Sequence, residues 1–208
     1  MAIKNGDNKL EVFRNIKSKV TPLDRSNIDT DQIIPKQFLK LVQRTDFGKY
    51  LFYDLRVDRD GNQRREFVLN DPKYAGRQIL LTRDNFGSGS SREHAAWAIT
   101  DYGFKAIIAE SFADIFYNNC FKNGLLPISL NHEEIEYLFR NSANIQVEID
   151  LSNQQVKACS KVMRFEIDSY RKMALLEGLD EIEMTLQFES QITEYEKKNS
   201  GIHYSMMG

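Results

Sequence analysis

One stretch, residues 79–109, constrains the fold of this chain more than any other. It opens with a short apolar strand at 79–82, passes through a loop rich in glycine and serine, and continues as a helix over 91–102. Gly103 ends that helix, and a second apolar strand follows at 106–109. This order of elements favours a parallel pair of strands joined by a right-handed crossover. The sequence therefore predicts a mixed α/β domain that contains a βαβ unit.

Further elements are expected on both sides of this unit, with no linker or repeat to divide the chain. We treat residues 1–208 as one domain and expect residues 1–14 and 195–208 to be loosely held termini. The other expected elements are a strand at 18–23, an Asx-stabilised loop in the polar half of 27–35, a short helix within 37–54, a turn at 58–63, a helix from Ser111 to about Lys122, a strand at 125–130, a helix capped by Asn131, a hairpin of 145–150 with 155–158, a last strand at 165–167, a helix at 169–177 and a short helix from Asp180 that leads to a polar tail.

Charge and hydropathy exclude several classes of function. The 208 residues carry a net charge of −2, with a pI near 6.0, which gives no electrostatic case for binding nucleic acid or an anionic membrane. No apolar run approaches the roughly 18 residues of a membrane span, and the first residues lack the apolar core of a signal peptide. We expect a cytoplasmic protein.

Cysteine and histidine usage argues against a metal site within this chain. Cys120 and Cys159 are the only cysteines, too few for a disulfide framework and at no zinc-binding spacing. A cubane iron–sulfur cluster needs at least three protein thiolates, so this chain cannot hold one alone. The three histidines share no helix-face spacing. Cys120, among aromatic residues, is expected to be a core residue.

The loop between the first strand and the helix of the βαβ unit, Asn85 to His94, has the composition of an anion-binding site. Gly87 and Gly89 permit backbone conformations and close approaches that a Cβ would block. Ser90 and Glu93 stand at capping-box spacing, which predicts a helix start near Ser91. Exposed N–H groups and the positive end of the helix dipole favour a carboxylate or phosphate at such a start.

Arg92 breaks a local rule within this loop. A cation in the first helical turn opposes the dipole at a cost of a few tenths to about 1 kcal/mol, which is more understandable if an anion lies between Arg92 and the helix. A glycine-rich turn with a capped helix and a solvated arginine remains an equal alternative from the residues alone. A nucleotide loop is not supported, because the Gly-Lys-Ser/Thr of a P-loop is missing and Arg92 replaces the third glycine of a dinucleotide fingerprint.

Several motifs together resemble the small-subunit family of bacterial 3-isopropylmalate dehydratases, which forms the swivelling β/β/α domain of the aconitase superfamily as a separate chain. The likeness runs from about Val20 to Tyr195. The stretches that carry it are NFGSGSSREHA at 85–95, NIDTDQIIP at 27–35, FVLN at 67–70, DYGF at 101–104 and SFADIF at 111–116. The resemblance implies an aconitase C-terminal-domain-like fold with a mixed sheet.

The resemblance also implies roles for individual residues. Ser90 corresponds to the general base that removes the proton next to a substrate carboxylate, and Asp31 to an aspartate that orients active-site groups. Ser91 corresponds to a substrate or oxyanion ligand, Arg92 to the arginine that grips a carboxylate through its fork, and Gly89 to a substrate-binding position. From the residues alone, Asp31 could equally be a turn-forming side chain.

Two neighbours of these residues, Asp29 and His94, are expected to have no catalytic role. Asp29, two positions from Asp31, is interpreted as a turn residue. His94 is interpreted as an orienting residue rather than a catalyst. Position 88 is serine where many relatives have cysteine, with no expected chemical consequence. The extra substrate arginine of single-chain aconitases has no clear counterpart here.

The implied reaction converts 2-isopropylmalate to 3-isopropylmalate through isopropylmaleate, a hydro-lyase step of leucine biosynthesis. The resemblance implies a [4Fe–4S] cluster on a large subunit as partner, no cofactor on this chain, and a small dicarboxylic hydroxy acid as substrate. Phe38, Leu39 and Lys40, within the segment 36–42, are candidates for a specificity loop that faces the isopropyl group; equally, they could be core residues of a short helix. Alternatives are a small subunit for homoaconitate, citraconate or dimethylmalate, and a non-catalytic anion-binding module.

Overall fold

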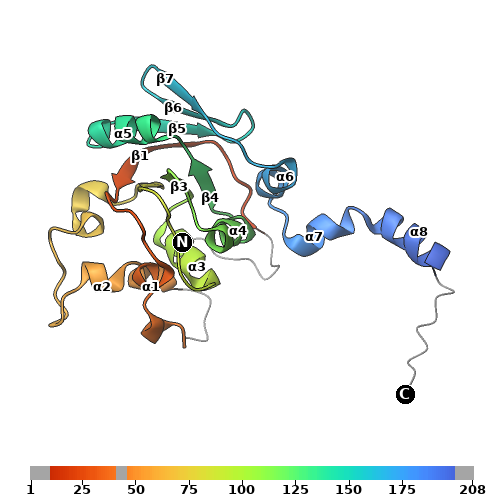
Figure 1. Ribbon diagram of the computed structural model, residues 1–208, viewed down its shortest axis with the longest axis horizontal. Helices are drawn as coiled ribbons and strands as arrows, with labels where there is room; N and C mark the ends of the chain where they lie inside the picture. The colour runs from red at the N-terminus through yellow and green to blue at the C-terminus, as the bar shows by residue number, and fades with distance from the viewer. Residues whose placement is uncertain (1–9, 41–45, 200–208) are drawn as a thin grey trace.

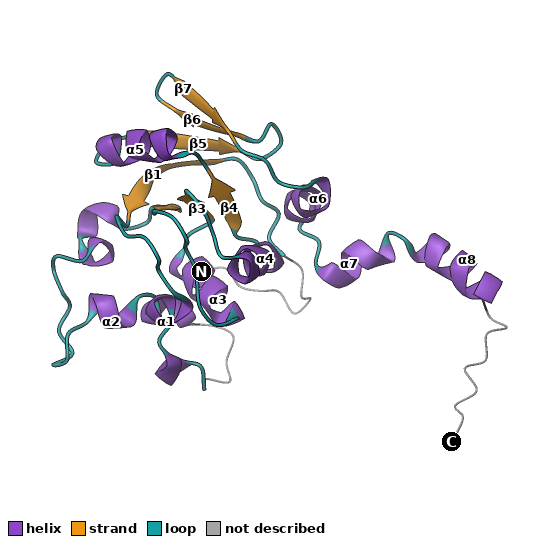
Figure 2. Ribbon diagram, viewed as in Figure 1, coloured by secondary structure: helices purple, strands orange, loops and turns teal. Residues whose placement is uncertain are grey.

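The computed structural model describes residues 10–40 and 46–199, and in these residues seven strands form one mixed sheet in the order β4-β3-β2-β1-β5-β6-β7. Figure 1 shows β5, β6 and β7 along the upper edge of the molecule, with β3 and β4 nearer its middle, and Figure 2 shows α5 beside β5 and α1, α2, α3 and α4 below the sheet. The strands are β1 (Ile16–Pro22), β2 (Ile79–Leu81), β3 (Ala106–Ala109), β4 (Leu126–Ser129), β5 (Gln146–Asp150), β6 (Gln155–Ala158) and β7 (Lys161–Arg164).

The predicted βαβ unit is confirmed. Strands β1, β2, β3 and β4 pair in parallel, and α3 (Glu93–Tyr102) and α4 (Asp114–Lys122) connect β2 to β3 and β3 to β4. Every residue of β2 and β3 is buried, which is typical of parallel strands covered on both faces. The side chains alternate between faces, so that Ile79 and Leu81 enter one apolar cluster while Leu80 enters the other.

Strand β1 joins the parallel half to an antiparallel half. On its other edge it pairs with β5, which continues through the predicted hairpin into β6 and β7. The expected last strand at 165–167 is wrong. A tight turn through Cys159, whose φ is 54°, starts β7 at Lys161 instead, and Phe165 follows the strand as a buried core residue.

Two apolar clusters lie on the two faces of the sheet. One cluster contains the buried residues of α5 (His132–Asn141) and Leu175 of α6 (Ser169–Glu177). The other contains Ala95, Ala98 and Ile99 of α3 together with buried residues of the segment between β1 and β2. That segment forms α1 (Thr30–Ile33), α2 (Tyr53–Arg56) and the 3-10 turns Lys36–Phe38, Phe47–Tyr50, Val68–Asn70 and Pro72–Tyr74.

The helix expected to begin at Ser111 begins three residues later, at Asp114. The Ser111 hydroxyl does not cap it; Oγ accepts a hydrogen bond from the Asn85 N–H at 2.8 Å. Phe86 and Phe112 form a parallel bridge beside this bond. A tertiary contact therefore holds residues 111–113 extended, and the local helix signal is overridden.

Part of each expected loose terminus lies within the described residues. Phe13 is buried and its N–H donates to the Leu175 carbonyl at 2.8 Å. After α6, whose Asp168 cap and Gly178 end agree with its predicted span, α7 (Glu181–Leu186) and α8 (Glu189–Asn199) extend away from the sheet (Figure 1). A helix thus occupies the start of the expected polar tail. The remainder of both expected termini lies outside the described residues.

Candidate active site at the ends of β1 and β2

The glycine-serine loop and the segment that precedes α1 lie side by side because they follow neighbouring parallel strands. Residues 23–29 leave the carboxyl end of β1, and residues 82–92 leave that of β2. In α/β sheets this edge is where ligands bind. Main-chain hydrogen bonds join the two segments: Gly87 N–H donates to the Ile28 carbonyl at 2.7 Å, and Thr30 N–H to the Ser88 carbonyl at 2.8 Å.

Both loop glycines are required by the backbone. Gly87 has φ +80°, and a Cβ there would lie 2.1 Å from Phe116 Cγ. The expected close approach is confirmed at this position. Gly89 has φ +91°, and a Cβ would meet Thr30 Oγ1 at an ordinary 3.5 Å. The constraint at Gly89 is therefore conformational rather than steric.

The helix start differs from the prediction. Helix α3 begins at Glu93, with Arg92 as its N-cap and no side-chain cap. The predicted capping box is wrong, because Glu93 Oε1 accepts instead from Asn123 Nδ2 at 3.1 Å. Ser90, the predicted cap, makes no side-chain cap, and its carbonyl accepts a hydrogen bond from Thr30 Oγ1 at 2.9 Å.

Arg92 is paired with Asp31 across the two segments. Its Nη1 and Nη2 donate to Oδ1 and Oδ2 of the carboxylate, the second at 3.1 Å, in a bidentate fork. Arg92 is the N-cap of α3, so its charge still lies beside the positive end of the helix dipole, and the paired Asp31 carboxylate offsets this conflict. Among the described residues, the anion that Arg92 contacts is the Asp31 carboxylate.

The charges of this pair are unequally exposed. The Arg92 side chain is 10% exposed and that of Asp31 is 41% exposed. The Arg92 guanidinium holds the pKa of Asp31 below its ordinary value, and Lys36 Nζ, 3.9 Å from Oδ2, acts in the same direction. The fork occupies two of the five guanidinium N–H groups. Arg92 can therefore hold Asp31 and still donate to a second carboxylate.

Ser90 and Ser91 present their side chains to solvent just before α3. Within the described residues, no protein group makes a hydrogen bond with either hydroxyl. The loop thus combines two exposed hydroxyls with an arginine that keeps unused N–H donors, an arrangement suited to a small acid that brings its own carboxylate.

The two neighbours of the site have structural partners. Asp29 Oδ1 accepts from the Gln32 N–H at 2.7 Å, and Gln32 Oε1 accepts from the Asp29 N–H, which forms a capping box around α1. This agrees with a turn role for Asp29. His94, the second residue of α3, lies with its ring 4.5 Å from that of Trp97 and 5.5 Å from that of Phe47.

The proposed specificity residues occupy a 3-10 turn and its end. Phe38 stacks on Tyr50 with ring centroids 4.0 Å apart, and Leu39 is half-buried against the same apolar cluster. Lys40 is exposed. The rest of the expected segment, residues 41 and 42, lies outside the described residues.

Sequence reasoning missed three residues that shape the site. Thr30 bonds to the loop twice, and Asn27 and Asn85 connect the bases of the two segments through a hydrogen bond from Asn85 Nδ2 to Asn27 Oδ1 at 2.8 Å. Both asparagines have left-handed φ angles, 56° and 52°. Asparagine tolerates that conformation better than most residues, so each was a usable turn signal.

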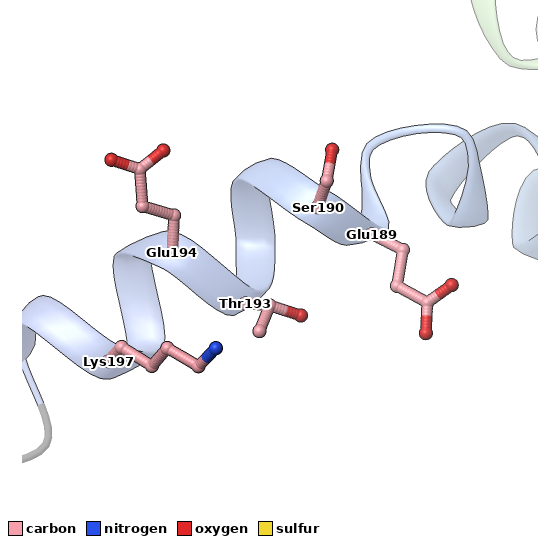
Figure 3. Close-up of a pocket in the computed structure, with 5 residues that line it drawn as sticks. All are labelled: Glu189, Ser190, Thr193, Glu194 and Lys197. Carbon is pink, nitrogen blue, oxygen red and sulfur yellow. The ribbon is translucent and has the colours of Figure 1, made fainter.

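Hollows elsewhere on the surface do not contain these residues. One is lined by Glu189, Ser190, Thr193, Glu194 and Lys197, which all project from the single helix α8 (Figure 3). Another lies at the end of the β5–β6 hairpin, beside β7. Among the described residues, no three His, Cys, Asp or Glu side chains gather as a metal site would require. In the same residues, no helix has the length and apolar character to cross a bilayer.

The cysteines do not fit an iron–sulfur cluster. Cys120 is a core residue, as expected, and burial raises the pKa of its thiol well above its ordinary value. Cys159 is exposed in the turn between β6 and β7. Two separated thiols, one of them inside the core, cannot supply the three thiolates that a cubane cluster needs.

Comparison with known proteins places this chain in a family. Residues 10–133 match the family model described as the aconitase C-terminal domain. A 3-isopropylmalate dehydratase small subunit from Geobacillus sp. (strain WCH70) is 57% identical over 186 residues, which cover 88% of this chain and 94% of the relative. One from Anoxybacillus flavithermus is 54% identical over 194 residues, which cover 92% of this chain and all of the relative.

A solved structure shows the same fold. The 3-isopropylmalate dehydratase chain from Methanocaldococcus jannaschii aligns with a TM-score of 0.66 at 28% identity, covering 88% of this chain and 99% of that one. The predicted aconitase C-terminal-domain-like α/β fold is therefore confirmed. By its sequence, its fold and its relatives, the chain belongs to the aconitase C-terminal domain family, among the 3-isopropylmalate dehydratase small subunits.

Proposed function

We propose that this chain is the small subunit of a two-chain 3-isopropylmalate dehydratase acting in leucine biosynthesis, in the cytoplasm. Relatives that bear this name are 54–57% identical over most of both chains. The observation that carries the proposal for the site is the meeting of Asp31, Ser90, Ser91 and Arg92 at one sheet edge, from segments about 60 residues apart in sequence.

In this proposal Arg92 binds a substrate carboxylate with the N–H groups that Asp31 leaves available. Asp31 fixes the plane of the guanidinium, so the carboxylate arrives in one orientation. Ser90, as an alkoxide, removes the proton from the carbon beside that carboxylate, and Ser91 and the Gly89 main chain bind the developing oxyanion. Loss of the neighbouring hydroxyl gives isopropylmaleate, and hydration at the other carbon gives 3-isopropylmalate.

We assign the remaining chemistry to a large subunit. Its [4Fe–4S] cluster would supply the Lewis acid that a departing hydroxyl requires. The exposure of Ser90 and Ser91 supports an active site that is completed by another chain. The same subunit would activate Ser90, whose hydroxyl has no base beside it within the described residues.

Reconstitution with the large subunit tests the proposal. Isomerisation of 2-isopropylmalate, followed through the ultraviolet absorbance of isopropylmaleate, should fall about 10²- to 10⁴-fold in Ser90→Ala. Ser26→Ala, at an exposed serine in the loop ahead of α1, is the matched control and should keep full activity. Dehydration by the isolated chain without iron or partner would refute the two-chain account.

The alternatives give different results in the same experiment. A small subunit for homoaconitate, citraconate or dimethylmalate would turn over that acid faster than 2-isopropylmalate. A non-catalytic module would bind a dicarboxylate tightly as the lone chain and add no activity to the large subunit. Leu39→Arg tests the specificity segment: if Leu39 faces the isopropyl group, the substituted enzyme should lose its preference for 2-isopropylmalate over citraconate-type acids. An unchanged preference assigns Leu39 to packing.

A further inference from the structure

The main chain on both sides of Gly89 is held by a single residue, Thr30. Thr30 is the first residue of α1 and is 2% exposed. Its N–H donates to the Ser88 carbonyl at 2.8 Å, and its hydroxyl donates to the Ser90 carbonyl at 2.9 Å. These two carbonyls flank the Cα atoms of Gly89 and Ser90, so Thr30 fixes the peptide group before the pair and the one after it.

This double contact decides where the Ser90 side chain points. Gly89 has φ +91° and no Cβ, so no side chain at this position limits its backbone angles. With the peptides on either side tied to Thr30, the direction of the Ser90 Cα–Cβ bond is set by α1. Without the hydroxyl bond, the peptide between Ser90 and Ser91 is held only from its far side, through Arg92.

Helix α1 is itself firmly placed. The Asp29–Gln32 capping box closes its first turn, and Ile33 is fully buried. The residue after Thr30 is Asp31, which grips Arg92. Consecutive residues of one anchored turn therefore hold the serine and the arginine of the site, and they set the position of one relative to the other.

We infer that Thr30 is the positioning residue for Ser90: through its hydroxyl, it aims the serine at the carbon whose proton is removed. The inference rests on the proposed function, in which Ser90 is the base. Thr30 does not contact the substrate in this account, and Arg92 keeps its own link to α1 when the Thr30 hydroxyl is removed. The hydroxyl should therefore affect turnover far more than substrate binding.

The experiment compares kcat and KM of the reconstituted enzyme in Thr30→Val and Thr30→Ser. A displacement of the order of 1 Å at a reacting group costs about 10²-fold in rate. We expect kcat to fall about 10- to 100-fold in Thr30→Val, with KM changed by less than about threefold because the Asp31–Arg92 pair stays intact. Thr30→Ser keeps the hydroxyl and should retain most of the activity.

A second buried threonine provides the matched control. The Thr82 hydroxyl donates to the Arg25 carbonyl at 3.1 Å, and Thr82 is fully buried, but it does not touch the residues around Gly89. Thr82→Val removes the same kind of bond and should leave kcat within about twofold. If Thr30→Val does not fold, Thr30→Ser and Thr30→Ala form a second pair that differs by one hydroxyl, and their kcat values should differ about tenfold or more.

The outcomes separate this inference from the proposed function. Unchanged kcat in Thr30→Val, equal kcat in the Ser and Ala variants, or an equal fall in Thr82→Val would overturn the positioning role while Ser90→Ala remains inactive. Full activity in Ser90→Ala would instead overturn the proposed function itself.

Discussion

Substitution of Gly87 by alanine tests how tightly the glycine-serine loop is packed onto the domain. The new Cβ would lie 2.1 Å from Phe116 Cγ and 2.4 Å from Cδ1, well inside any tolerated contact. Phe116 is 2% exposed and has little room to move. Overpacking of this kind costs about 1–3 kcal/mol. The left-handed φ of +80° adds about 1–2 kcal/mol for any residue with a Cβ.

A smaller effect opposes these two costs. Alanine restricts the unfolded chain and so stabilises the folded state by about 0.4–1 kcal/mol. The net expectation is a loss of about 1–5 kcal/mol in the free energy of unfolding. Gly76 offers the matched control, because it has φ +73° and its Cβ would meet nothing within 4 Å. Gly76→Ala therefore carries the conformational terms without the clash.

The assay is urea unfolding of the full-length chain, read as the midpoint at constant slope. Gly87→Ala should lose about 1–3 kcal/mol more than Gly76→Ala, since the difference isolates the contact with Phe116. Equal losses in the two variants, within about 0.5 kcal/mol, would show that the loop is held by backbone conformation alone, and the packing argument would fail.

Three further predictions concern charge, an unpaired hydroxyl and the thiols. Asp31→Asn should lower the free energy of unfolding by only about 1 kcal/mol at pH 7, because the carboxylate is 41% exposed. Arg92 lowers the pKa of Asp31 in the folded state, so the carboxylate stabilises the fold above its unfolded-state pKa of about 4, and this contribution is lost as the pH falls further. The stabilities of the wild-type and variant proteins should therefore converge in acid. Thr21→Val should leave stability unchanged or raise it by up to about 1 kcal/mol in thermal unfolding, because the buried Thr21 hydroxyl has no hydrogen-bond partner among the residues that the structure describes. A clear loss of stability would contradict this absence. A thiol reagent should modify Cys159 quickly and Cys120 only after denaturant is added, because burial raises the pKa of the Cys120 thiol; rapid loss of both thiols in the native protein would contradict its burial.

The parallel half of the sheet could be predicted because its signals are local. Continuous apolar runs at 79–81 and 106–109 and the helix ended by Gly103 specify a βαβ unit without help from distant residues. The hairpin of β5 and β6 and the capping box of Asn131 were equally local. The strand expected at 165–167 was wrong. Phe165 and Ile167 have the alternation of a strand, but the turn at Cys159 makes the last strand begin at Lys161 and end at Arg164.

The residues of the site could be predicted from the sequence, but their contacts with one another could not. The resemblance brought Asp31 and Arg92 to one site, and the structure pairs them directly. The helix start near Ser91 was wrong because both members of the predicted capping box have distant partners: the Ser90 carbonyl accepts from Thr30, and the Glu93 carboxylate accepts from Asn123. A threonine at the start of a four-residue helix carries no distinctive local signal, so its contact with the loop is visible only in three dimensions.

The long separation between the two segments has a consequence for how the protein matures. Asp31 and Arg92 are 61 residues apart in sequence, as Thr30 and Ser90 are 60 apart. Closing a loop of that length carries an entropic cost that must be met before either contact forms, and contacts of this kind slow folding. The pairing of β1 with β2 brings the segments together. A chain in which β1 and β2 have not yet paired therefore contains every residue of the site but not the arrangement that makes it one.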